Sequence, residues 1–66
     1  MNLIEHPKHY THGIQPLDVI DSWKLDYYLG NVVKYICRHN HKGKPLEDLK
    51  KAQCYLNRKI KLMEEE

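Results

Sequence analysis

Phenylalanine is absent from this sequence of 66 residues, tryptophan occurs once, and glycine and proline occur three times each. Tyrosine, with five copies, is therefore the main aromatic residue. A helical core built with tyrosine contains hydroxyl groups that need hydrogen-bond partners, and subunit interfaces and ligand sites supply such partners. The composition favours a small domain whose tyrosines lie close to an interface or to a bound ligand.

The sequence also lacks any apolar run that approaches the roughly 20 residues needed to span a membrane, and its N-terminus lacks the apolar segment of a secretory signal. Cysteine occurs only twice, at Cys37 and Cys54, and both fall within predicted helices. We expect these thiols to be reduced and to act as small packing residues. The expected location is the cytoplasm.

The short length of the chain limits the core that it can form. A chain of about 60 residues buries only about 60% of the surface that it exposes when unfolded, so such chains usually need further stabilisation. Self-association is the simplest source of additional buried surface. We predict a single domain, with an N-terminal arm over residues 1–15 and a helical part over residues 16–66, that forms a homo-oligomer.

Local signals predict an all-α fold in which an irregular arm and a short helix precede two longer helices that form an antiparallel hairpin. The short helix begins at Pro16, because proline suits the first helical position. The second covers residues 26–40 with Asp26 as its N-cap, and Gly43 supplies a left-handed turn after it. The third helix, of about 20 residues, begins at Pro45.

Each predicted helix has an apolar stripe; we expect those of the first two helices to face the core, and that of the third to form a narrow seam. In the first helix these residues are Leu17, Ile20 and Trp23. In the second they are Leu29, Val32, Val33 and Ile36, and in the third they are Leu46, Leu49, Ala52 or Gln53, Leu56, Ile60 and Met63. Gly30 lies within the second helix, where it predicts close approach by another backbone or by a ligand.

The third helix is longer than so small a domain can cover, and its C-terminal half, residues 55–63, is predicted to pair with a second copy. The alternative is a lone helix that frays after Arg58.

The second helix also carries a polar face, on which Asn31, Lys34, Tyr35 and Arg38 recur at i, i+3, i+4 and i+7. Two cations, an amide and an aromatic ring on one face suit a phosphorylated ligand. The cations bind phosphate oxygens, the amide contacts a base or sugar edge, and the ring offers a stacking surface. The alternative is that these cations are simply solvated.

Positive charge continues into the turn before the third helix. Residues 34–51 contain six lysines and arginines but only two carboxylates, although the net charge of the chain is +2. The turn contributes Lys42, which lies close to a helix N-terminus where phosphate can bind. The spacing is not that of a P-loop, and a solvated basic turn is the alternative.

Histidines in the arm suggest zinc, but the usual thiolate ligands are missing and we predict no metal site. His9, followed by Tyr10, is instead expected to close over the ligand from the arm.

Asp18 and Asp21 with Glu47 and Asp48 form the remaining candidate group for a metal. The chain lacks the ExxE and ExxD pairs of all-α nucleotide pyrophosphatases, so magnesium enters only with an enzymatic alternative.

Three segments together resemble a known family. They are His9-Tyr10 with residues 13–20, the segment Leu29–Arg38 with its GN-x-x-KY-x-x-R pattern, and the segment Pro45–Leu56 with its EDL-x-KA-x-x-YL pattern. In this order they resemble small tailed-phage proteins of unknown function that are often labelled nucleotide-kinase-like. The resemblance covers residues 6–60. This chain differs from the family pattern in the turn after Arg38, where it has His39-Asn40-His41 and its relatives tend to have small residues.

The resemblance implies a phage protein, acting in the cytoplasm of the infected host, that is linked to nucleotides or to counter-defence. It adds Asp48, Lys51 and Tyr55 to the candidate site residues His9, Tyr10, Asn31, Lys34, Tyr35, Arg38 and Lys42. We expect a binder that sequesters or senses a nucleotide-like anion without catalysis. The alternatives are a nucleoside monophosphate kinase that acts as an oligomer, and a non-catalytic adaptor for a host protein or nucleic acid.

Overall fold

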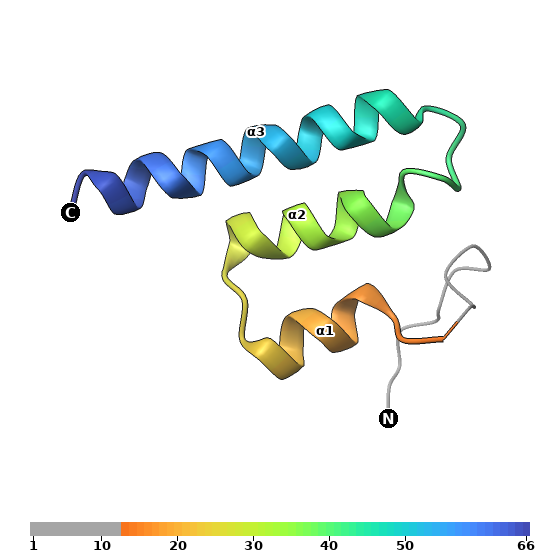
Figure 1. The fold of residues 1–66 in the computed structure, drawn as a ribbon. Helices are drawn as coiled ribbons and strands as arrows, with labels where there is room; N and C mark the ends of the chain where they lie inside the picture. Colours follow the sequence, from red (N-terminus) through yellow and green to blue (C-terminus); the bar gives the residue numbers. More distant parts are fainter. Residues whose placement is uncertain (1–12) are drawn as a thin grey trace.

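The computed structural model describes residues 13–66, which form three α-helices (Figure 1). Helix α1 covers Pro16–Trp23, α2 covers Tyr27–Arg38 and α3 covers Pro45–Glu64. Within these described residues there is no strand, so the predicted all-α class is confirmed. Helices α2 and α3 form the predicted antiparallel hairpin, and α1 packs on the other side of α2.

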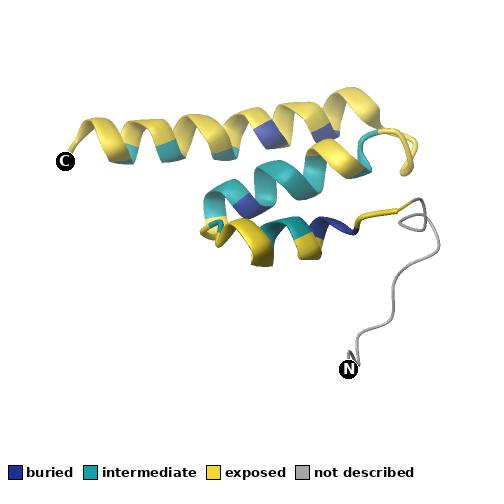
Figure 2. Cartoon of the chain, turned by 60° about the horizontal axis from the view of Figure 1, so that its bottom comes forward, coloured by how far each residue is buried: buried dark blue, intermediate teal, exposed yellow. Residues whose placement is uncertain are grey.

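The three helices lie side by side in one layer with α2 in the middle (Figure 1). The fold measures 38 × 29 × 15 Å along its principal axes, so it is much thinner than it is long or wide. Half-buried residues concentrate on α2, whereas α3 is exposed along most of its length (Figure 2). No described helix is both long and apolar enough to cross a lipid bilayer.

The helix starts agree with the local signals in the sequence. Pro16 and Pro45 occupy first-turn positions of α1 and α3. Asp26 caps α2, because its side chain accepts a hydrogen bond of 2.9 Å from the backbone N–H of Leu29. The turn over residues 39–44 contains Gly43 at φ +81°, the left-handed conformation that was predicted for it. Helix α2 ends at Arg38, slightly earlier than expected.

The face of α3 that packs on α2 is not its apolar stripe. The residues of α3 that are buried or half-buried recur at spacings of four and three, and they are Asp48, Ala52, Tyr55, Lys59 and Leu62. In the predicted stripe only Ala52 is buried, while Leu46, Leu49, Leu56, Ile60 and Met63 are all exposed. The stripe is rotated by about a quarter turn from the face that meets α2.

The predicted inward stripes of α1 and α2 are partly wrong. Ile36 is 48% exposed, and in α1 both Leu17 and Trp23 are exposed. The reason is the central position of α2, which has a neighbour on each of two sides and is therefore not packed through one apolar face. Its side toward α1 carries Gly30, and its side toward α3 carries Tyr35 and Arg38.

The contacts of Tyr35 with Tyr55 and of Arg38 with Asp48 fix how α2 and α3 are rotated, since each residue advances about 100° around a helix. The two surfaces of the α2–α3 pair are then distinct. One, the cationic face, carries Asn31, Lys34 and Arg38 of α2 together with Lys51 of α3. The opposite one, the apolar face, carries Leu29 and Ile36 of α2 together with Leu49, Leu56, Ile60 and Met63 of α3.

Gly30 is approached by a side chain of α1, and not by the backbone that was one of the two predicted neighbours; the other, a ligand, stays a prediction. A Cβ built on Gly30 would lie 3.5 Å from side-chain atoms of Ile20, an ordinary van der Waals distance. Gly30→Ala should therefore stabilise the protein by about 1 kcal/mol through its better helix propensity. Urea unfolding followed by circular dichroism measures this change.

Gly43→Ala is the matched control for that substitution, because nothing surrounds a Cβ at this position but the φ of +81° is unfavourable for alanine. It should destabilise the protein by about 1 kcal/mol. Equal effects of the two substitutions would contradict this account of the two glycines.

Candidate anion-binding site

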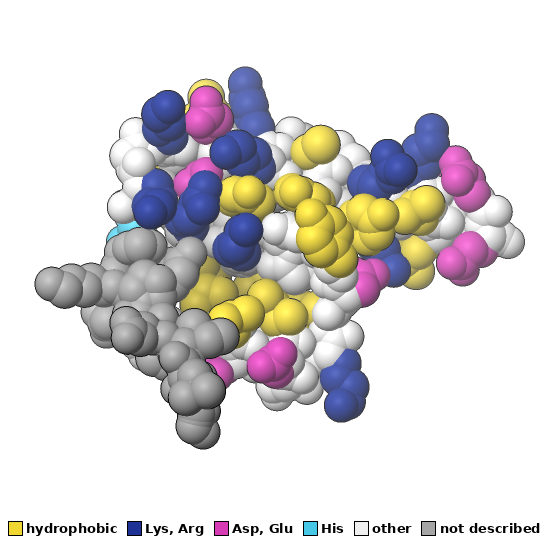
Figure 3. Space-filling model, turned by 180° about the vertical axis from the view of Figure 1, so that it is seen from behind, with side chains coloured by type: hydrophobic (Ala, Val, Ile, Leu, Met, Phe, Trp, Pro, Cys, Tyr) yellow, Lys and Arg dark blue, Asp and Glu magenta, His cyan; other side chains and the backbone are white. Residues whose placement is uncertain are grey.

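Three cationic side chains surround the ring of Tyr35 on the cationic face. Lys34 Nζ lies 4.8 Å from the ring centroid, Arg38 Cζ lies 4.8 Å from it, and Lys51 Nζ lies 5.5 Å from it. All three distances are within the range of cation–π attraction. Figure 3 shows Lys and Arg side chains gathered at the end of the molecule where α2 ends and α3 begins. Lys34, Tyr35 and Arg38 come from α2, whereas Lys51 comes from α3.

Tyr35 is held in place by a tyrosine cluster between α2 and α3. Its ring stacks on that of Tyr55, with centroids 5.9 Å apart and planes 15° apart. Tyr27 meets the Tyr55 ring edge-on, at a centroid distance of 5.9 Å. The hydrogen bond with Tyr27 is the main reason that the pKa of the Tyr55 hydroxyl is raised above its usual value of 10.0. Tyr55 therefore stays neutral at physiological pH and joins the two helices beneath the cations.

Arg38 is oriented by a carboxylate of the opposite helix. Its Nη2 lies 3.2 Å from Asp48 Oδ1, and its Nε donates to Asp48 Oδ2 at 3.4 Å, so that both carboxylate oxygens are engaged. The Asp48 side chain is 3% exposed, whereas that of Arg38 is 24% exposed. The hydrogen bond from Arg38 is the main reason that the pKa of the Asp48 carboxyl lies below its ordinary value. Asp48 thus orients the guanidinium and does not itself offer a surface to a ligand.

A shallow hollow between α1 and α2 adjoins this group. It is lined by residues of both helices and of the segment between them, namely Ile20, Leu25, Asp26, Tyr27, Gly30, Asn31 and Lys34. The Asn31 side chain donates a hydrogen bond of 2.8 Å to the carbonyl oxygen of Tyr27, which fixes the orientation of the amide. Lys34 belongs both to the hollow and to the group around Tyr35, so the two features are continuous.

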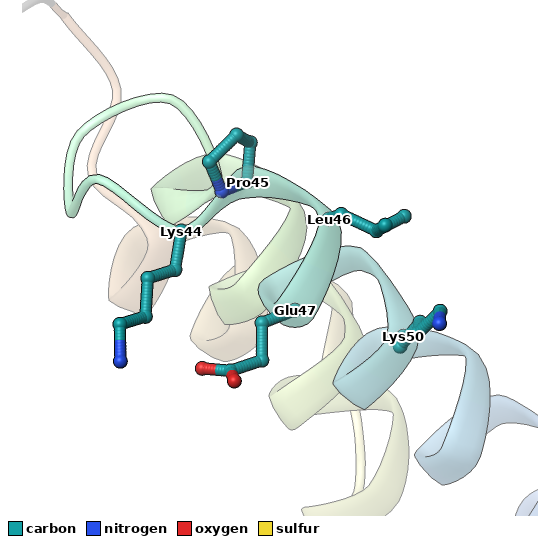
Figure 4. Close-up of a pocket in the computed structure, with 5 residues that line it drawn as sticks. All are labelled: Lys44, Pro45, Leu46, Glu47 and Lys50. Atoms are coloured by element: carbon teal, nitrogen blue, oxygen red, sulfur yellow. The ribbon is translucent and has the colours of Figure 1, made fainter.

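A second hollow lies at the start of α3, where it is lined by Lys44, Pro45, Leu46, Glu47 and Lys50 (Figure 4). Lys44 and Glu47 extend toward one side of the first turn, whereas Leu46 extends away from them. The Glu47 carboxylate is therefore next to the helix start where an anion was expected to bind. Lys42 lies in the exposed part of the turn, residues 40–44, and is not among the cations around Tyr35.

Most of the candidate site residues come together on the cationic face, and these are Asn31, Lys34, Tyr35, Arg38, Asp48, Lys51 and Tyr55. His9 and Tyr10 lie outside the described residues. Residues 13–66 contain no group of three or more histidine, cysteine or acidic side chains arranged to hold a metal ion.

One family model matches this sequence over most of the length of the chain. The model of the family DUF3310, described as a protein of unknown function, matches residues 4–57. The chain belongs to this family. No curated protein and no solved structure matches it. The part that matches DUF3310 contains α1, α2, the first two-thirds of α3 and every candidate site residue.

The sequence patterns did not single out two contributors to this candidate site, Tyr27 and the ion pair beside it. Asp26 Oδ2 lies 2.6 Å from Lys59 Nζ, which ties the start of α2 to α3. A signal for Tyr27 was present, because Tyr27, Asn31 and Arg38 recur at i, i+4 and i+11 on one helix face. Lys59 gave no such signal, since its partner lies on another helix.

The two ion-paired carboxyls predict how stability depends on acidity. The backbone N–H of Leu29 lowers the pKa of Asp26, and Arg38 lowers that of Asp48, in each case from an ordinary value of 3.8. Because the unfolded chain then binds more protons than the folded one, the free energy of unfolding that these two carboxylates contribute is fully present above about pH 4 and is lost as the pH falls further. The urea concentration at half-unfolding should therefore decline below that pH. In Asp48→Asn it should decline less steeply than in the native chain, because one of the two carboxylates has been removed. An equal slope for Asp48→Asn would contradict this assignment.

Proposed function

We propose that this protein is a phage-encoded, non-catalytic binder of a nucleotide or a related phosphorylated anion, which it sequesters or senses in the cytoplasm of the infected cell. Such a role belongs to nucleotide metabolism or to counter-defence. The observation that carries the proposal is the convergence of Lys34, Arg38 and Lys51 around the ring of Tyr35. Cations from two helices that lie beside one aromatic ring suit a ligand with an anionic group, which the cations bind, and a planar group, which can stack on a ring.

The arrangement suggests how the ligand is held. The ammonium groups of Lys34 and Lys51 bind phosphate oxygens, while the carboxylate of Asp48 keeps the Arg38 guanidinium in a fixed orientation. Since Lys34 also lines the hollow between α1 and α2, a phosphate beside Lys34 leaves the sugar or base over that hollow. The Asn31 amide is then the group that contacts a base or sugar edge.

The state of the nearby carboxylates favours binding over catalysis. Asp48 is paired with Arg38, and Asp26 is paired with Lys59. Both carboxyls have lowered pKa values, which makes them weaker bases than an ordinary carboxylate. A kinase would need a base that accepts the proton of the attacking group, and these two are poorly suited to that role.

Isothermal titration calorimetry of the full chain against mono-, di-, tri- and cyclic nucleotides tests the proposal. Saturable binding of at least one nucleotide is the expected result, and silence across the panel would overturn it. The bound nucleotide should be recovered unchanged by chromatography after long incubation with magnesium and ATP. Transfer of phosphate under these conditions would support the oligomeric kinase instead.

A further inference from the structure

The described part of the chain has very little interior of its own. Within residues 13–66 no large side chain is fully buried, and the buried apolar residues are Pro16 and Ala52. The helices form a layer that is only 15 Å thick. Stable domains bury the apolar side of one layer against a second layer, so this layer requires a partner.

The apolar face is the surface that needs covering. Its large side chains are about half exposed: Ile36 is 48% exposed, Leu49 41%, Leu56 40%, Ile60 45% and Met63 59%. They come from two adjacent helices, and those of α3 follow one another along the helix at spacings of seven, four and three. Contiguous exposed apolar surface of this kind marks an interaction site.

We propose that the apolar face packs against the same face of a second copy of this chain, giving a two-layer dimer of six helices. The area is sufficient, because a layer of 38 × 29 Å can supply the roughly 800 Å² per partner that a stable interface buries. The distribution of charge selects this face. Pairing through the cationic face would bring Lys34 and Lys51 of both copies together, whereas pairing through the apolar face keeps the two cationic faces on opposite outer surfaces.

The α3 stripe also gives the expected geometry. It runs from Leu49 to Met63 with Leu56 at its centre, so a two-fold axis at that point brings Leu56 of the two copies together in an antiparallel arrangement. The acidic tail Glu64–Glu66 of one copy then lies near the start of α3 in the other, where two lysines, Lys44 and Lys50, outnumber the single carboxylate of Glu47 in the same hollow. This charge complementarity favours a second copy as the occupant.

Sedimentation velocity of the full chain tests the dimer, independently of any ligand. At about 100 µM, well above the Kd of a weak specific interface, the chain should sediment with twice its mass of 7.9 kDa. Leu56→Asp should halve the mass, while Arg58→Asp, an exposed residue of α3 away from the apolar face, should leave the dimer intact. A monomeric native chain, or a dimer that Leu56→Asp leaves unchanged, would overturn the proposal.

Cross-linking covers the case in which Leu56→Asp fails to fold. In a Cys37→Ser/Cys54→Ser background, Leu56→Cys should form a covalent dimer when copper phenanthroline and oxygen remove two electrons and two protons from a pair of thiols. Arg58→Cys is the matched control and should remain monomeric on a non-reducing gel. No cross-link at Leu56→Cys, or an equal yield at Arg58→Cys, would overturn the proposed pairing.

The dimer has a consequence that rests on the proposed function. Each copy presents its group around Tyr35 on an outer surface, so the dimer would bind two anions on opposite sides. Calorimetry of the native chain should then give one ligand per chain. The same stoichiometry in monomeric Leu56→Asp would show that the site does not depend on the dimer. Sedimentation therefore tests the dimer and calorimetry tests anion binding, so a negative result in one experiment leaves the other proposal standing.

Discussion

The double variant Lys34→Glu/Lys51→Glu is expected to bind nucleotide at least about 100-fold more weakly than the native chain, because a hydrogen bond from a charged group contributes about 1.5–3 kcal/mol and both ammonium groups are replaced by carboxylates. Lys34 and Lys51 lie 4.8 and 5.5 Å from the Tyr35 ring centroid, so both reversals change the charge at one place. Calorimetry with the tightest-binding nucleotide of the panel measures the loss.

The matched control for this variant is Lys50→Glu/Lys61→Glu, which makes the same change of net charge at exposed positions of α3 away from the cationic face. Its affinity should fall only slightly, through the long-range effect of net charge, and added salt should reduce that difference. If the two double variants lose affinity equally, the protein attracts anions through its overall charge and the group around Tyr35 is not a site.

The substitution Asp48→Arg is expected to cause the largest loss of folded structure. The Asp48 side chain is 3% exposed and is bonded to Arg38, so the change places two guanidinium groups at one buried position between α2 and α3. Asp48 and Ala52 are the buried residues of α3 in the described part of the chain, and small domains have little stability to lose. Far-ultraviolet circular dichroism should show loss of most helical signal at room temperature.

The charge-swapped variant Arg38→Asp/Asp48→Arg separates this effect from a simple problem of size. It restores one carboxylate and one guanidinium to the same pair of positions, and it should recover much of the helical signal. Recovery is expected to be incomplete, because the shorter aspartate now extends from α2. A folded Asp48→Arg single variant would show that the ion pair is not needed to join α2 to α3.

The role of Asp48 illustrates what sequence patterns leave open. Its position in the first turn of α3 is typical of an acid that favours the helix dipole, and that role explains it without any partner. The structure gives it a second role, because the rotation of α3 turns this carboxylate inward to Arg38. No spacing in the sequence predicts that pairing, since the two residues lie on different helices joined by a turn.

The apolar stripe of α3 has the composition that its spacing predicts, but it does not face α2. Leu49, Leu56 and Ile60 do recur on one side of the helix, as their spacing predicts. An apolar stripe shows which side of a helix avoids water in the final assembly, but it does not say whether the neighbouring helix or a second chain covers it. In this chain Ala52 and Tyr55 meet α2, and the larger apolar residues remain for another surface.

The sequence by itself determined the three helices, their starts at Pro16 and Pro45 and the cap at Asp26, because these signals act within a few residues of one another. It also placed Asn31, Lys34 and Arg38 on one face, since helical periodicity is local. Only the tertiary structure decided that Lys51 and Tyr55 meet Tyr35. That encounter depends on how α2 and α3 are rotated against each other, which is fixed by contacts between residues of two different helices and not by the local spacing within either one.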